Sequence, residues 1–292
     1  MKGVVQSIVN HFDLRRHGVN PDVFSLHRGV TDHNRDVQVI VSLTSHPGRI
    51  DKAHLTIRTI INQTYKPDHI ILWLADEQFP DGESSLPKQL LRLRKNGLEI
   101  RWTKDTNSYK KLLPSLKEFP EAIIITFDDD WYYRCDLVQN LMIEHKNHPN
   151  EIISNLVTRP ILDASGCVIG NKEYDESLGT CDYLNKQVGS DGVLYPPHSL
   201  DNEVFSEEFF KLAPTNDDIW FWTMAVKNKT RIFCPKNPTR AYAMTAPAIQ
   251  NKTSLSEYNS ENNTYTLCMR SIFEEYPEVL RILNAEETEA VL

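Results

Sequence analysis

Apolar residues between positions 37 and 130 recur in two alternating patterns. Short runs rich in β-branched residues predict four strands, over 37–45, 69–76, 98–105 and 121–130. Apolar positions at helical spacing separate these runs over 50–64, 86–97 and 108–120, and Gly97 suits the residue that ends the second helix. Strands that alternate with helices pair in parallel through right-handed crossovers. We therefore expect an α/β fold with an open, mostly parallel, twisted sheet flanked by helices.

The pattern loosens after a further helix at 137–149. Short strands and turns follow to about residue 187, then a glycine-flanked strand in "GSDGVLYPPHSL", an apolar helix over 215–228 and a strand over 230–235. Helical spacing already explains Trp220, Phe221 and Trp222 as core residues. We divide the chain into an N-terminal arm (1–35), a first half (36–150), a second half (151–245) and a C-terminal loop and helix (246–292).

The last predicted helix, over 270–283, is amphipathic. Its apolar positions are Ile272, Phe273, Tyr276, Leu280 and Leu283. Its several glutamates disfavour an anionic lipid surface, so we expect it to dock on protein. No segment supplies the roughly 20 uninterrupted apolar residues of a membrane span.

Charge and cysteine content exclude some classes of protein. The net charge of −8 argues against a protein that coats nucleic acid, because phosphate neutralisation needs surplus Lys and Arg. The five cysteines are scattered and lack C-x-x-C spacing, so neither a disulfide framework nor a zinc site is expected. We expect a cytoplasmic protein and leave peripheral contact with the inner membrane open.

Three acids, Asp128, Asp129 and Asp130, end the fourth predicted strand. Ligands of open parallel sheets bind beyond the carboxyl ends of the strands, which places this triplet on the binding rim. Alternation along a strand would turn Asp128 and Asp130 to one side, where they could bind a divalent cation, and Asp129 to the other. The alternative is that the three acids lie in a solvated turn or cap a helix beginning near Cys135.

A second acidic pair, Asp217 and Asp218, opens the predicted helix over 215–228. Acids in a first turn are what any helix favours, with Thr215 or Asn216 as the N-cap. The functional alternative is a general base that takes a proton from an acceptor hydroxyl. Both readings can hold, because a capping role also fixes a side chain.

Basic residues near the rim are candidates for stabilising a leaving diphosphate. Arg49 follows the first strand, and Lys110 and Lys111 precede the fourth. His46 could contact a nucleotide base or fill its loop. For each of these residues a solvated structural role is the alternative.

Six segments in this order resemble bacterial glycosyltransferases of the GT-A fold, in particular the family-2-like enzymes of capsule and lipopolysaccharide synthesis. The segments are "VIVSLTSHPGRI", "INQTYKPDHIILWLADEQFP", "LEIRWTKDTNSYKKLLPSL", "IIITFDDDWYY", "GSDGVLYPPHSL" and "TNDDIWFW". The resemblance covers about residues 37–243. It implies that 36–150 binds the nucleotide sugar and that 151–245 binds the acceptor and carries the catalytic acid.

The resemblance also assigns roles to single residues. Asp128 and Asp130 match the metal-binding D-x-D, and Asp218, beside Asp217, matches the catalytic base. The positions expected to contact the nucleotide or its diphosphate are Thr44, His46, Arg49, Asp76, Lys110, Lys111, Asp128 and Asp129. Asp76 is expected to accept from a uracil N3 proton.

Two departures from the family pattern stand out. Ser190 and Asp191 replace glycines, which we expect to reshape the sugar or acceptor pocket. No histidine follows His198, so the late histidine that many GT-A enzymes supply to the metal is missing.

The sequence therefore predicts a Mg²⁺- or Mn²⁺-dependent transferase that moves a sugar from a nucleotide donor to a hydroxyl. The resemblance implies a UDP-sugar donor, inversion, and an oligosaccharide or lipid-linked glycan acceptor in surface polysaccharide synthesis. A retaining enzyme of the same fold and a non-catalytic glycan- or nucleotide-binding protein remain alternatives. A nucleotidyltransferase is disfavoured because its Gly-rich, Lys-bearing N-terminal loop is missing.

Overall fold

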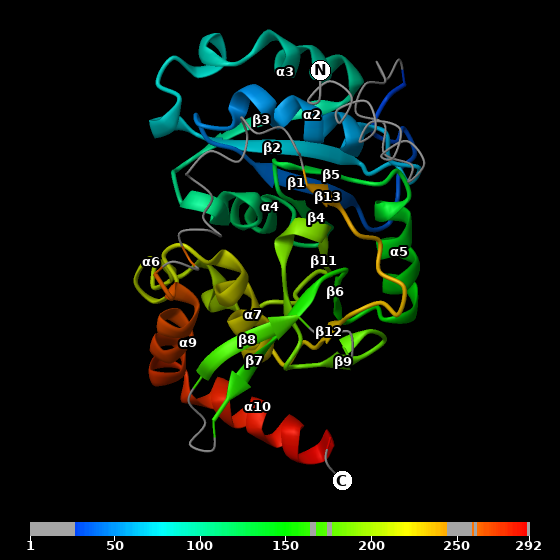
Figure 1. Ribbon diagram of the computed structural model, residues 1–292. Helices are drawn as coiled ribbons and strands as arrows, with labels where there is room; N and C mark the ends of the chain where they lie inside the picture. Colours follow the sequence, from blue (N-terminus) through cyan, green and yellow to red (C-terminus); the bar gives the residue numbers. More distant parts are fainter. Residues whose placement is uncertain (1–26, 164–167, 174–176, 244–258, 260–261, 291–292) are drawn as a thin grey trace, which may run out of the picture.

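The computed structural model describes residues 27–163, 168–173, 177–243, 259 and 262–290, and its centre is one large sheet (Figure 1). The strand order is β3-β2-β1-β4-β11-β6-β12-β9. The first four are β1 (Val39–Thr44), β2 (His69–Ala75), β3 (Leu98–Thr103) and β4 (Ile123–Phe127). They pair with one another in parallel, which confirms the four predicted strands and their direction.

The second half completes the sheet with strands of both directions. These are β6 (Ile152–Ser154), β9 (Cys181–Asp182), β11 (Val193–Tyr195) and β12 (Ile232–Phe233). Strand β11 is antiparallel to both β4 and β6, and β9 is antiparallel to β12, while β12 and β6 are parallel. Six of the eight strands therefore share one direction, as expected of a mostly parallel sheet.

Two smaller sheets lie beside the large one. The first contains β10 (Lys186–Gln187), β7 (Val157–Leu162) and β8 (Val168–Glu173). The second pairs β5 (Trp131–Tyr132), directly after the acidic triplet, with β13 (Tyr242–Ala243). A segment more than 100 residues later in the chain thus borders the acids.

Helices cover both faces of the sheet, because its central strands are apolar on both sides. Val39, Val41 and Leu43 pack with α2 (Ile50–Ile61), α3 (Lys88–Arg92) and α5 (Leu137–Asn147). Ile40, on the opposite face, shares a core with α4 (Leu113–Glu118), α6 (Phe209–Leu212) and α7 (Asp217–Lys227). This alternation is the period of two that a strand imposes on its side chains.

Helix α7 is the most buried of these helices. Trp220, Phe221 and Trp222 are fully buried, which confirms their expected core role. Every residue from Ile219 to Val226 is buried, which anchors the first turn that carries Asp217 and Asp218.

Short single-turn elements connect the longer ones. They are η1 (Asp76–Gln78), η2 (Gly82–Ser85), η3 (Leu93–Asn96), η4 (Asn107–Lys111), η6 (Gly189–Asp191) and η7 (Asn202–Phe205). The predicted helix over 86–97 is split into α3 and η3, and Gly97 ends it at φ 102°, as expected of a left-handed terminal residue. The predicted helix over 108–120 is likewise split into η4 and α4.

The single C-terminal helix predicted over 270–283 is wrong. Two helices, α9 (Thr264–Glu275) and α10 (Pro277–Ala290), meet at Tyr276. A residue before proline is driven from the helical region, and Tyr276 has φ −121° and ψ 68°. The expected docking on protein is confirmed, because Ile272, Phe273 and Leu283 join the core beside α7.

Most of the predicted arm (1–35) and of the loop over 246–263 lies outside the described residues. Among the described helices, none combines the length and apolarity that crossing a bilayer requires. Cys135, Cys181, Cys234 and Cys268 are free thiols.

Candidate active site

The acidic triplet follows the last residue of β4, at the carboxyl edge of the parallel strands. Tyr133 holds the first acid through the backbone, because its hydroxyl accepts from the Asp128 N–H at 3.0 Å and donates to the Asp128 carbonyl at 3.3 Å. Thr56 of α2 donates its hydroxyl to the carbonyls of Asp129 and Trp131, at 2.8 and 2.9 Å. The aromatic residues and α2 therefore fix the path of the chain through the triplet.

Arg49 and Ser45, from the loop after β1, compensate two of the acids. The Arg49 Nη1 atom lies 3.1 Å from Asp129 Oδ1 and 2.9 Å from Asp130 Oδ2. Ser45 Oγ donates to Asp129 Oδ2 at 2.5 Å. Asp129 and Asp130 thus face the same guanidinium, and strand alternation does not set Asp129 apart, since β4 ends at Phe127. Metal binding by Asp128 and Asp130 stays a prediction. The capping alternative fails, because β5 lies between the triplet and α5.

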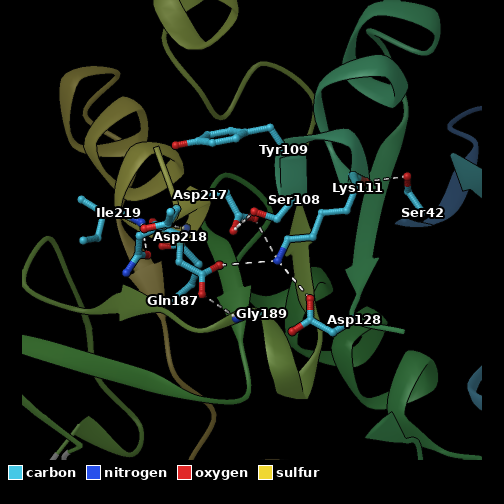
Figure 2. A network of polar contacts seen from close by, with 12 residues as sticks. Ser42, Ser108, Tyr109, Lys111, Asp128, Gln187, Gly189, Asp217, Asp218 and Ile219 are labelled. Carbon is cyan, nitrogen blue, oxygen red and sulfur yellow. Dashed lines mark hydrogen bonds and ion pairs between the residues drawn. The ribbon is translucent and has the colours of Figure 1, made fainter. Parts of the chain in front are cut away.

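Lys111 compensates the first acid and joins it to the second acidic pair (Figure 2). Its Nζ atom lies 3.0 Å from Asp128 Oδ1, 2.9 Å from Asp217 Oδ2 and 3.8 Å from Asp218 Oδ1. One buried ammonium thus brings together acids that are about 90 residues apart in the sequence. The predicted binding and catalytic acids lie in one site.

The two acids at the start of α7, Asp217 and Asp218, have different surroundings. Asn216 caps the helix, with its side chain accepting from the Ile219 N–H at 3.3 Å. Asp217 is buried and accepts from Ser108 Oγ at 2.8 Å in addition to its ion pair with Lys111. Asp218 is more exposed, at 19% against 10% for Asp217, and accepts from the Gly189 N–H at 3.1 Å. Burial raises the pKa of Asp218 above that of an ordinary carboxyl, although the Lys111 ammonium opposes this.

The other predicted contacts line the same rim without joining the Lys111 cluster. Thr44 Oγ1 donates to the Trp73 carbonyl at 2.8 Å and so ties β1 to β2. Lys110 is buried and paired with Asp105. His46 lies among charged neighbours at the start of α2, and burial lowers its pKa. Asp76 is exposed on η1, beyond the end of β2.

Three residues of the site were not singled out from the sequence. Asp105 follows β3 and accepts from Gln78 Nε2 at 2.7 Å, so it lies on the rim as Asp76 does. The strand-end rule that places the acidic triplet on the rim could have found it. Ser108 and Lys186 carry no such sequence signal. Lys186 is buried near Asp217 and Asp218, donates to the Gln187 carbonyl at 3.2 Å, and has a pKa lowered by burial.

Asp191 has an anchoring position in the described structure. It is buried, accepts from the Ala241 N–H at 2.8 Å and pairs with Arg240 Nε at 3.0 Å. It therefore fastens the segment that leads into β13. The expected reshaping of a sugar or acceptor pocket by Ser190 and Asp191 stays a prediction.

Divalent cations are the cofactor that the sequence implies. Among the described residues, no group of three or more His, Cys, Asp or Glu side chains could hold a metal ion. Asp128 and Asp130 provide two hard oxygen donors of the kind that Mg²⁺ and Mn²⁺ bind. The five carboxyl groups of the site share two basic side chains that contact them directly, Arg49 and Lys111. A divalent cation would fit this surplus of carboxyl groups, and it would need further ligands besides Asp128 and Asp130.

Comparisons with known proteins find similar structures but no sequence family. No family model matches the chain, and no curated protein matches it. Structures of S. aureus TarS are similar in part. The complex with UDP has a TM-score of 0.49 at 12% identity over 82% of this chain, and the complex with UDP-GlcNAc has 0.47 at 12% over 74%. The match spans 61–65% of those TarS chains.

A CMP:2-keto-3-deoxy-manno-octonic acid synthetase complexed with CTP is also similar. Its TM-score is 0.44 at 12% identity, over 78% of this chain and all of the synthetase chain. At these scores the similarities leave the activity of this chain to be argued from its own residues.

Proposed function

We propose that this chain is a glycosyltransferase that moves a sugar from a nucleotide-sugar donor to a hydroxyl of an acceptor. The observation that carries the proposal is the meeting of Asp128 and Asp218 at one ammonium, 3.0 and 3.8 Å from Lys111 Nζ. One acid stands where open parallel sheets bind their ligands, and the other begins a helix of the second half. A transferase needs these two groups together, since its donor and acceptor react at one point.

The donor end of the site is the acidic triplet. Asp128 and Asp130 would hold Mg²⁺ or Mn²⁺, which would supply positive charge against a leaving diphosphate. The surplus of carboxyl groups over basic side chains supports this role, because a diphosphate would be repelled by these acids without a cation between them. Arg49 keeps Asp129 and Asp130 in place. The rim residues Thr44, His46, Asp76 and Lys110 are the proposed contacts of the nucleotide, for which we propose uridine.

Asp218 is the proposed general base. Asp217 is committed to Ser108 and Lys111 at 2.8 and 2.9 Å, whereas Asp218 accepts one backbone N–H and lies farther from the ammonium. Its raised pKa makes it a stronger base than an ordinary carboxylate. It takes the proton of the acceptor hydroxyl as that oxygen attacks the anomeric carbon from the side opposite the diphosphate, so we propose inversion.

The first test is turnover. Purified protein with Mn²⁺ should hydrolyse or transfer sugar from at least one member of a panel of nucleotide sugars, with UDP-sugars as the expected donors. NMR of the new linkage reports inversion or retention. Lack of turnover of every donor, together with lack of UDP binding, would refute the proposal.

Two substitutions should separate binding from chemistry. Asp218→Asn should lower kcat by about 10²–10⁴-fold and leave the Kd for UDP with Mn²⁺ unchanged, since a lost general base affects only proton transfer. Asp130→Ala should weaken Mn²⁺-dependent UDP binding, which isothermal titration measures.

Asp136→Asn is the matched control. Asp136 is also a half-exposed aspartate, paired with Arg134 at 2.7 Å, but it precedes α5 outside the site. It should change neither quantity. Equal loss of UDP affinity in Asp218→Asn and Asp130→Ala would contradict the division of roles.

A further inference from the structure

The turn η4 belongs to the first half of the chain but also makes polar contacts with the second. Tyr109 donates its hydroxyl to the Ala213 carbonyl at 2.6 Å, and its ring stacks on Phe209 with centroids 4.3 Å apart. Ser108 donates to Asp217 at 2.8 Å, and Lys111 reaches the same carboxylate at 2.9 Å. Three of the five residues of η4 thus hold the segment that leads into α7 (Figure 2).

A chain of buried hydrogen bonds ties η4 to β1, β2 and α4. Ser42 of β1 donates to the Lys111 carbonyl at 2.6 Å and lies 2.8 Å from Ser115 Oγ. The Trp73 indole of β2 donates to the same Ser115 oxygen at 2.8 Å. These residues are all buried on central strands or on α4, so their hydrogen bonds fix the backbone of Lys111.

The surroundings of the Lys111 ammonium leave little space for a phosphate. The side chain is only 6% exposed, and three carboxylates already face its Nζ atom. The backbone of η6 closes another side, because a Cβ added to Gly189 would lie 2.7 Å from Nζ, 3.3 Å from Asp218 Oδ1 and 3.4 Å from Asp128 Oδ1. A diphosphate oxygen would have to displace one of the acids to reach this cation.

We propose that Lys111 of η4 is a positioning residue for the transfer step. It aligns the start of α7, at Asp217 and Asp218, with Asp128. It does not bind the diphosphate of the donor. This inference rests on the proposed function and replaces the role that the sequence suggested for Lys111. The ammonium holds Asp217 directly, and through it the first turn of α7 that carries Asp218. Positioning of this kind affects turnover, whereas a phosphate contact affects binding.

The test compares turnover with nucleotide affinity in Lys111→Met. Positioning predicts a fall in kcat of about 100-fold for hydrolysis of the best nucleotide sugar, as expected of a misplaced catalytic group. The Kd for UDP in the presence of Mn²⁺ should stay within about 3-fold of wild type or become tighter, because Asp128 loses a competing cation. Lys111→Arg, which keeps the charge, should recover most of the lost kcat.

Two further variants guard against misfolding of Lys111→Met, which leaves buried acids unpaired. Gly189→Ala keeps every charge; its Cβ displaces the flexible end of Lys111, at 2.7 Å, and presses less closely on Asp218 Oδ1, at 3.3 Å. Ser108→Ala removes the second donor to Asp217. Both should lower kcat without loss of UDP affinity.

Lys227→Met is the matched control. Lys227 is a mostly buried lysine at the other end of α7, 2.8 Å from Glu203. Its loss should lower Tm but leave kcat unchanged, which separates stability from positioning.

The outcomes distinguish the inference from the function on which it rests. One result would overturn the inference alone. In it, the wild-type protein turns over a nucleotide sugar, and Lys111→Met and Gly189→Ala keep their kcat but lose UDP affinity by 10-fold or more. A kcat that stays near wild type in Lys111→Met and Gly189→Ala would overturn it as well. Wild-type protein that turns over no nucleotide sugar would overturn both.

Discussion

Asp130 is an acid whose ionisation the fold opposes. Burial raises its pKa to about 6, and the neighbouring charges of Asp128 and Asp129 add to this, while Arg49 opposes it. The folded protein therefore binds a proton more tightly at this carboxyl than the unfolded chain does. The contribution of Asp130 to stability falls as pH rises from about 4 through 6, since the charged form then has to be held in the fold.

Asp130→Asn should for this reason stabilise the metal-free protein at high pH. We expect a gain of about 1–2 kcal/mol in the free energy of unfolding at pH 8, after allowance for the partial exposure of the carboxyl. The gain should shrink as pH falls through 6 and vanish near 4. Thermal unfolding from pH 4 to 8 measures it, and a gain that is the same at all pH values would contradict the assignment.

At the scale of residues, the sequence predicted which acids lie in the site better than which side chains they contact there. Asp128, Asp217 and Asp218 were found from their places at a strand end and a helix start. Their meeting at Lys111 depends on tertiary contacts between segments about 100 residues apart, which no local pattern encodes. Asp105, which follows β3, has the same strand-end position as the acidic triplet, so the sequence carries a signal for it.

At the scale of elements, positive backbone angles show where strands and helices must change direction. Gly97 ends η3 at φ 102°, and an added Cβ would lie 2.9 Å from Val30 Cγ2. Gly82 has φ 56° and nothing within 4 Å of such an atom. The two glycines share a left-handed backbone and differ in their surroundings.

Gly97→Ala and Gly82→Ala therefore form a matched pair. Gly82→Ala should cost about 1 kcal/mol from backbone strain alone, and Gly97→Ala about 2–3 kcal/mol because of the added contact with Val30. Urea unfolding gives both values. An equal loss in the free energy of unfolding for both variants would show that Val30 moves aside at no energetic cost.

Elements with strong local sequence patterns were predicted, and elements with weak patterns were missed. The four parallel strands and Gly97 were predicted correctly because long apolar runs and a terminal glycine are strong signals. The break at Tyr276 was missed because the apolar spacing continues across Pro277. The small strands β5 and β13 depend on each other across the chain and have no pattern of their own.

At the scale of the molecule, the C-terminal helices complete the core of the second half. Val279 and Leu283 of α10 are fully buried in the cluster that contains Trp220 and Trp222. Arg231 also contacts α10, through Glu286 at 3.1 Å, but this pair is partly exposed. Apolar burial, more than the ion pair, holds α10 in place.

Leu283→Ala should accordingly destabilise the protein by about 2–4 kcal/mol, the usual range for a buried leucine. Arg231→Ala, on the same contact surface, should cost less than about 1 kcal/mol. Chemical denaturation compares the two. If Arg231→Ala cost as much as Leu283→Ala, the ion pair would matter more than the structure indicates.

The position of η4 limits how this chain can be recombined with relatives. A chimaera joined at residue 150 would place Ser108, Tyr109 and Lys111 from one parent against residues 213–218 of another. The two halves could then be exchanged only if residues 105–113 were taken from the same parent as the second half, so a working chimaera would need two further junctions within the first half.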